Sequence, residues 1–183
     1  MEEIIGRMTF PSMFNETLRK FGKCNAYALV GESPISYEAA DKQIKSVMAF
    51  LEKNGIEPGD KVAILSSNMP NWGIAFFAIT FMGAVAVPIL PDFSNTEVNN
   101  VITHSGARVL FVSTSLLAKS QEIVSEDLFL RISIDDFSLI SGDSALSPFI
   151  PGTVPVKKYD IGKQILCQLY LDYKNCFVTL YFY

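Results

Sequence analysis

The run from Trp72 to Leu90 carries no charged residue, and it constrains the fold more than any other part of the sequence. By length and hydropathy alone, such a run could cross a bilayer as one helix. Gly83 divides it, however, and Pro88 falls where a single helix would have to continue. We therefore interpret it as two elements. Residues 70–82 form a helix that is apolar on every side, and residues 84–89 form a short buried strand that ends in a loop.

The residues before this run complete a βαβ unit. Lys61–Leu65 is typical of another short buried strand, and residues 66–68 form the turn into the helix. No cluster of Lys or Arg flanks the apolar run on one side, and the chain has no charged-then-apolar signal segment at its start. These features favour a buried unit over a membrane span. A small membrane protein remains an alternative, which detergent-dependent extraction would reveal.

Composition limits the class of protein. The chain has 183 residues, of which 49% are hydrophobic and 19% charged, as in a globular domain or one lobe of a larger protein. Its net charge of -4 and the lack of a Lys/Arg stripe interleaved with aromatic residues argue against a nucleic acid partner.

The cysteines and the single histidine give little support to catalysis. Cys24, Cys167 and Cys176 include no Cys-x-x-Cys pair, so the sequence contains no recognisable zinc site or disulfide framework, and a reducing compartment is indicated. A Cys/His nucleophile pair is conceivable, but free buried cysteine is far commoner. His104 lies near the C-terminus of a predicted helix, where we favour a capping or surface role over a catalytic one.

The N-terminal third predicts two helices and a hairpin. Thr9 caps a helix that ends at Gly22. One face of this helix carries Phe14, Leu18 and Phe21, and this spacing predicts that the face packs in the core. Residues 26–30 and 33–37 flank Gly31-Glu32 and predict a β-hairpin. Ser36 caps a second helix that ends at Gly55, and its apolar face consists of Ile44, Val47, Met48 and Leu51.

The middle of the chain continues the alternation of helices and strands. Ser94 and Glu97 form a capping box for a helix that runs to about His104. Strands are predicted over residues 108–112 and 128–134, with a helix over residues 116–124 between them. Alternating elements with short connections predict an α/β fold, with a largely parallel sheet and helices on both faces.

The sequence divides into three parts. Residues 1–8 form a loose start, residues 9–160 form the globular region, and residues 161–183 form an atypical tail. Within the globular region, residues 141–155 are rich in Ser, Gly and Pro and predict a surface loop. The tail is aromatic and β-prone, which in an exposed terminus is an aggregation hazard.

Five segments of the chain form a specific set of motifs by their order and spacing. They are Ser36-Tyr-Glu-Ala, Gly55-Ile-Glu-Pro-Gly-Asp-Lys-Val-Ala-Ile-Leu, Asn68-Met-Pro-Asn-Trp, Met82-Gly-Ala-Val-Ala-Val-Pro-Ile-Leu and His104-Ser-Gly-Ala-Arg-Val-Leu-Phe-Val. Together they resemble the N-terminal part of AMP-forming acyl-CoA synthetases, and the variant with Val-Pro-Ile-Leu is most similar to long-chain fatty acid CoA ligases. The resemblance covers residues 9–160. The resemblance implies the N-terminal lobe of the AMP-binding synthetase fold, incomplete at its C-terminal edge.

The resemblance also implies a reaction whose sequence motifs are absent from this chain. The family uses ATP and Mg²⁺ to form an acyl-adenylate and then transfers the acyl group to CoA. Its phosphate-binding loop, of the form Thr-Ser-Gly-Thr-Thr-Gly, does not occur in this sequence, nor do its adenine, Mg²⁺ and ribose segments or its catalytic lid lysine. Gly162-Lys163 is no P-loop, because position 157 is Lys where the motif requires Gly. We therefore assign no catalytic, cofactor-binding or metal residue, and expect no cofactor on this chain alone.

The tail offers an explanation for the missing loop. Residues 168–175 stand near the place where the family has its phosphate loop, and permitted codons for them, read from the second base, give Asn-Tyr-Thr-Ser-Thr-Thr-Arg. A frameshift is thus one hypothesis. A deliberate short product and an unrelated native C-terminal element are the alternatives.

The functional expectation is a cytoplasmic, truncated long-chain fatty acid CoA ligase that is inactive alone. Its full-length relatives would take a fatty acid, and a separately encoded C-terminal remainder is a possible partner. Contact with a membrane surface remains open. The alternative is a noncatalytic lobe that binds acyl chains or a partner.

Overall fold

The computed structural model describes residues 9–29, 31 and 33–141. Along the chain it forms α1 (Phe10–Phe21), β1 (Asn25–Tyr27), β2 (Ile35–Ser36), α2 (Tyr37–Lys53), β3 (Lys61–Leu65), α3 (Pro70–Phe81), β4 (Val85–Ile89), α4 (Asn95–Ser105), β5 (Val109–Val112), the 3₁₀ helix η1 (Thr114–Ser120), β6 (Leu130–Ser133) and β7 (Leu139–Ser141). The predictions for the loose start, for the loop beyond residue 141 and for the tail fall outside the described residues.

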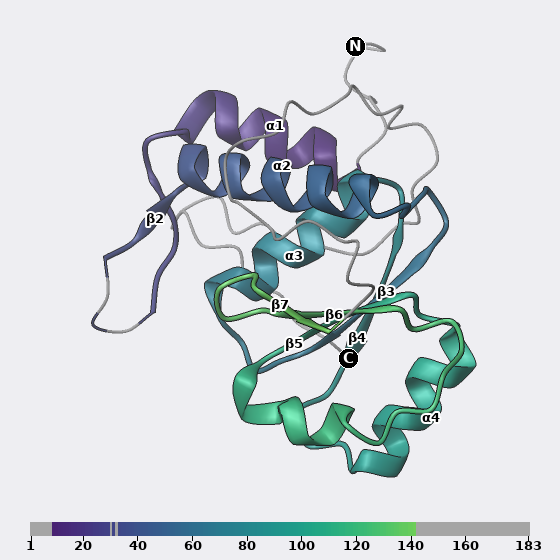
Figure 1. Ribbon diagram of the computed structural model, residues 1–183. Helices are drawn as coiled ribbons and strands as arrows, with labels where there is room; N and C mark the ends of the chain where they lie inside the picture. Colours follow the sequence, from purple (N-terminus) through teal and green to yellow (C-terminus); the bar gives the residue numbers. More distant parts are fainter. Residues whose placement is uncertain (1–8, 30, 32, 142–183) are drawn as a thin grey trace.

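A five-stranded sheet in the order β4-β3-β5-β6-β7 lies at the centre of the fold (Figure 1). β3 pairs in parallel with β4 and β5, and β5 pairs in parallel with β6, whereas β7 joins antiparallel. All of β5 is buried, as is β3 after Lys61. Such continuous burial is typical of parallel strands covered on both faces. The predicted parallel sheet and βαβ unit are confirmed.

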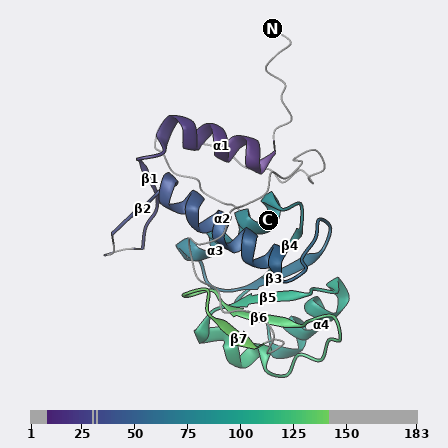
Figure 2. The ribbon, with the colours of Figure 1, turned by 45° about the horizontal axis from the view of Figure 1, so that its top comes forward.

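Helices cover both faces of the sheet (Figures 1 and 2). α1, α2 and α3 lie on one side, and α4 and η1 lie on the other. Side chains of the central strands alternate between the two cores, since Ile64 and Phe111 pack toward α2 and α3 while Leu65 and Leu110 pack toward α4. This alternation follows from the period of two along a strand. The predicted α/β class is therefore confirmed.

The apolar helix α3 is buried because it packs against the helices α1 and α2 and the strands β3 and β4. The ring of Trp72 stacks on Phe76 with centroids 5.3 Å apart, and Phe10 of α1 meets Phe76 edge-on at the same distance. Within the described residues, no helix is long and apolar enough to cross a membrane.

The three predicted N-caps are confirmed. Thr9 forms a capping box with Ser12, and Ser94 forms one with Glu97. The Oγ of Ser36 accepts a hydrogen bond from the first turn of α2. Gly106 ends α4 in the left-handed conformation, at φ 64°. The hairpin is also confirmed as the antiparallel pair β1–β2, although its paired part is shorter than predicted.

Strand β4 differs from the prediction, because it is an edge strand and most of it is only partly buried. The end of the strand agrees with the prediction, since β4 runs through Pro88 to Ile89. The N–H of Val85 points toward β3, since it donates to the carbonyl of Asp60. Successive backbone N–H positions along a strand point to opposite sides, so the backbone nitrogen of Pro88, three residues later, faces away from β3. Proline is tolerated there because the N–H that it lacks would face the open edge.

Three further details correct the sequence prediction. Residues 116–124 do not form the predicted helix, since only the 3₁₀ helix η1 is present and it ends at Ser120. Phe21 is 42% exposed and does not share the buried position of Phe14, because it ends the outermost helix. Ser141, predicted as the first residue of a loop, instead ends strand β7, which was not predicted.

Candidate functional site

The carboxyl edge of the parallel sheet is the place where this topology would position a ligand. After β3 the chain leaves to α3 on one face of the sheet, whereas after the neighbouring β5 it leaves to η1 on the other face. In open α/β sheets, ligands bind outside the carboxyl ends of strands at such a switch point. The candidate site is therefore the edge formed by the residues that follow β3, β5 and β6.

Two buried serines follow the central strands at this edge. Ser66 comes directly after β3 and is 3% exposed, and Ser113 comes directly after β5 and is 1% exposed. The Oγ of Ser66 donates to the carbonyl of Ser67 at 2.9 Å, and the Oγ of Ser113 lies 3.2 Å from that of Ser115. Both hydroxyls thus have partners within their own loops, and neither is paired with a general base of the kind that activates a nucleophile.

Asp135 is the centre of a hydrogen-bond network at the same edge. Its Oδ2 accepts from the backbone N–H of Thr114 at 2.7 Å and from the Thr114 hydroxyl at 2.6 Å. The Nδ2 of Asn71 donates to the carbonyls of Ile134 and Asp135, both at 2.8 Å. This network, which we call the carboxyl-edge network, joins the start of α3 to the residues that follow β5 and β6.

The charge of this edge disfavours a phosphate ligand. Asp136 follows Asp135, and a hydrogen bond from the Ser138 hydroxyl, aided by the Ser138 N–H, lowers the pKa of the Asp136 carboxyl. The Asp136 side chain therefore adds negative charge near neutral pH. Phosphoryl chemistry instead needs N–H donors and a cation near the phosphoryl oxygens. The N–H donors at Thr114 and Asn71 are already bonded to acceptors within the protein.

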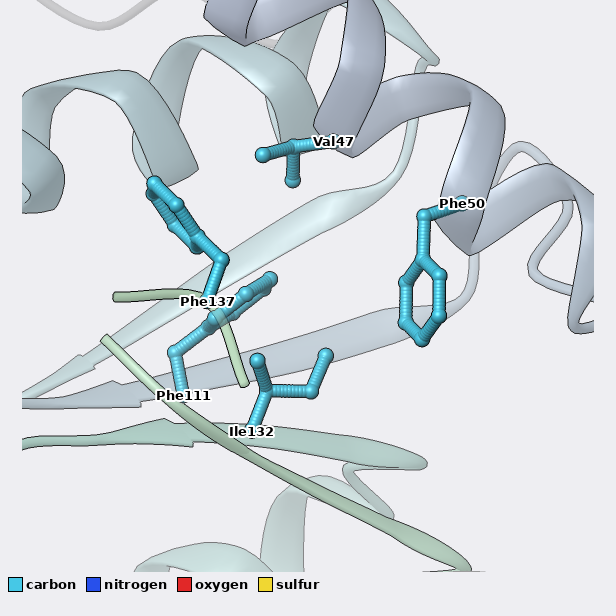
Figure 3. Close-up of a pocket in the computed structure, with 5 residues that line it drawn as sticks. All are labelled: Val47, Phe50, Phe111, Ile132 and Phe137. Atoms are coloured by element: carbon cyan, nitrogen blue, oxygen red, sulfur yellow. The ribbon is translucent and has the colours of Figure 1, made fainter. Parts of the chain in front are cut away.

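An apolar pocket lies beside this edge, between α2 and the sheet. Its walls are Val47, Phe50, Phe111, Ile132 and Phe137. Figure 3 shows that Val47 and Phe50 come from the helix, Phe111 and Ile132 from the strands, and Phe137 from the loop that closes the pocket. The pocket is too narrow to hold a water molecule, so it is a packing gap in this conformation.

Phe137 has an unusual backbone conformation. Its φ of 58° lies in the left-handed region, which side chains with a Cβ rarely adopt. Its ring is 7% exposed and meets Phe111 edge-on, with centroids 6.1 Å apart. Burial of the ring offsets the backbone strain, which is about 1–3 kcal/mol for such a residue.

A second group of contacts lies at the opposite, amino edge of the sheet. The Nη1 of Arg108 donates to Asp60 Oδ2 at 2.6 Å and to the carbonyl of Gly55 at 2.9 Å. The Arg108 guanidinium also lies 5.2 Å from the centroid of the Phe129 ring. These contacts, which we call the amino-edge clamp, join the turn before β3 to the starts of β5 and β6.

The residues considered for catalysis are not brought together. Cys24 is a free, exposed thiol beside the hairpin, and His104 is exposed near the end of α4, on the other face of the sheet (Figure 1). The surface role favoured for His104 agrees with this exposure. Cys167 and Cys176 lie outside the described residues. In the part of the chain that the structure describes, no group of three or more His, Cys, Asp or Glu side chains could hold a metal ion.

Sequence reasoning missed the side chains that organise both edges. Asn71 and Arg108 lie in segments that carry the family resemblance, but the sequence does not indicate their partners, Asp135 and Asp60. The one available signal was a polar Asn inside the otherwise apolar start of α3.

Curated relatives are acyl-activating enzymes. A segment of 77 residues, 42% of this chain and 13% of the relative, is 42% identical to "Long-chain-fatty-acid--CoA ligase FadD15" of Mycobacterium bovis. Another segment of 109 residues, 60% of this chain, is 28% identical to "3-[(3aS,4S,7aS)-7a-methyl-1,5-dioxo-octahydro-1H-inden-4-yl]propanoyl:CoA ligase" of Rhodococcus jostii. The chain spans 21% of the length of that second relative.

Solved structures share the fold. The N-terminal domain of FACL13 from Mycobacterium tuberculosis superposes with a TM-score of 0.62 at 21% identity, over 73% of this chain and 37% of that one. The anthranilate CoA ligase AuaEII, solved with anthranoyl-AMP, superposes with a TM-score of 0.65 at 21% identity, over 69% of this chain and 25% of that one. Because the family model described as "AMP-binding enzyme" matches residues 14–151, the chain belongs to the AMP-binding enzyme family and corresponds to its N-terminal part.

Proposed function

We propose that this chain supplies the N-terminal lobe of a long-chain fatty acid CoA ligase. In this proposal the complete enzyme uses ATP and Mg²⁺ to form an acyl-adenylate and then passes the acyl group to CoA in the cytoplasm. The observation that carries the proposal is the 42% identity, over 77 residues, to a relative named for long-chain fatty acids, against 28% over 109 residues for the relative named for an octahydroindenyl propanoyl group. The latter relative supports the coarser assignment to acyl-CoA ligases.

We further propose that the chain forms no adenylate by itself. Its sequence lacks the family's phosphate-loop motif, and the N–H donors of the carboxyl-edge network, at Asn71 and Thr114, are bonded to acceptors within the protein. When a carboxylate attacks ATP, negative charge gathers on the phosphoryl oxygens, and the bonds described at this edge leave neither the Thr114 N–H nor the Asn71 amide free to offset it.

Exchange of labelled pyrophosphate into ATP tests both proposals. The purified chain should give no exchange with palmitate, Mg²⁺ and ATP. Mixing it with a separately expressed C-terminal remainder, taken from the genomic sequence that follows the codon for Tyr183, should restore exchange with palmitate in preference to coumarate or benzoate. Exchange by the chain alone would refute its inactivity. Restored exchange that prefers an aromatic acid would refute the fatty acid assignment.

A noncatalytic, partner-binding lobe is the second candidate. The open edge at β4 favours it, because β4 is only partly buried and Leu90 at its end is 59% exposed. The narrow pocket at Phe137 gives no support to binding of an acyl chain. Size-exclusion chromatography of the mixture separates the candidates, since a stable complex without exchange activity supports the noncatalytic lobe.

Cell fractionation tests the cytoplasmic assignment, and recovery of the chain with membranes would instead support contact with a membrane surface.

A further inference from the structure

We draw no further inference here: the strongest candidate, the apolar pocket between helix α2 and the sheet that Phe137 closes, is too narrow to hold a water molecule, and nothing among the described residues shows what would open or occupy it.

Discussion

The contact between the β1–β2 hairpin and α3 gives the sharpest test of the packing. Gly73→Ala is expected to destabilise the protein when Tyr27 is present and to stabilise it when the Tyr27 ring is removed. A Cβ added at Gly73 would lie 2.8 Å from Cε1 and 2.9 Å from the hydroxyl oxygen of Tyr27. Side-chain carbons do not approach other heavy atoms so closely, so the hairpin or the helix would have to move. Gly73 is therefore the position where the Tyr27 ring rests on the backbone of α3.

Two opposing contributions to the free energy of unfolding set the size of the Gly73→Ala effect. Alanine is favoured over glycine in a helix by about 0.8–1 kcal/mol. Overpacking a filled site costs about 1–3 kcal/mol. Gly73→Ala should therefore change the free energy of unfolding by between about zero and 2 kcal/mol, in the destabilising direction. In a Tyr27→Ala background the clash is absent, and the same substitution should stabilise the protein by about 1 kcal/mol.

Urea unfolding of the four variants in this double-mutant cycle measures the coupling. Far-UV circular dichroism is the primary signal, because Trp72 adjoins the mutated site and its fluorescence would change for local reasons. The coupling between the two positions should equal the overpacking cost, about 1–3 kcal/mol. Equal effects of Gly73→Ala with and without the Tyr27 ring would refute the argument, as would stabilisation of the wild-type background.

Three other predictions follow from the structure. Pro88→Val should restore an outward N–H on β4 and increase self-association in light scattering, whereas the same assay on Val87→Ile, at an inward backbone position, should show no increase. Asn71→Ala removes two hydrogen bonds of the carboxyl-edge network and should destabilise the protein by about 1–2 kcal/mol in urea, and an unchanged midpoint would contradict that role. Burial raises the pKa of the Tyr27 hydroxyl. As pH rises above 10.0, the unfolded state therefore loses the hydroxyl proton before the folded state does, and the free energy of unfolding should fall. Tyr27→Phe should flatten that alkaline fall, and an unchanged slope would show that other groups cause it.

Periodic patterns predicted most of the fold because burial determines both the pattern and the structure. The apolar face of α2 and the continuous apolar strands β3 and β5 are examples. The prediction failed at residues 116–124, where local hydrogen bonds compete with an α-helix. Ser120 is fully buried, and its Oγ donates to the carbonyl of Leu117 at 2.8 Å. Such short-range hydrogen bonds from a serine side chain favour a tight turn over the continuation of a helix. The spacing of apolar residues carries no information about these bonds.

Position within the sheet is the second kind of information that a linear pattern lacks. β4 consists of Val, Ala, Pro and Ile and resembles a central strand, yet the chain crosses from β4 over β3 to place β5 on the far side, which leaves β4 at the edge. Strand order depends on these crossovers and not on the residues of one strand. Pro88 was the available sign, because proline is confined to edges and bulges within sheets.

The segments that carry the family resemblance have structural roles where this structure describes them. Asp60 and Arg108 come from two of those segments and meet in the amino-edge clamp, and Asn71 comes from a third and holds the carboxyl-edge network. Each side chain joins elements distant in sequence, so its role in this lobe is structural. Substitution at these positions should thus alter stability without altering substrate preference. It follows that matches at these three positions identify the fold and not the acid that is activated.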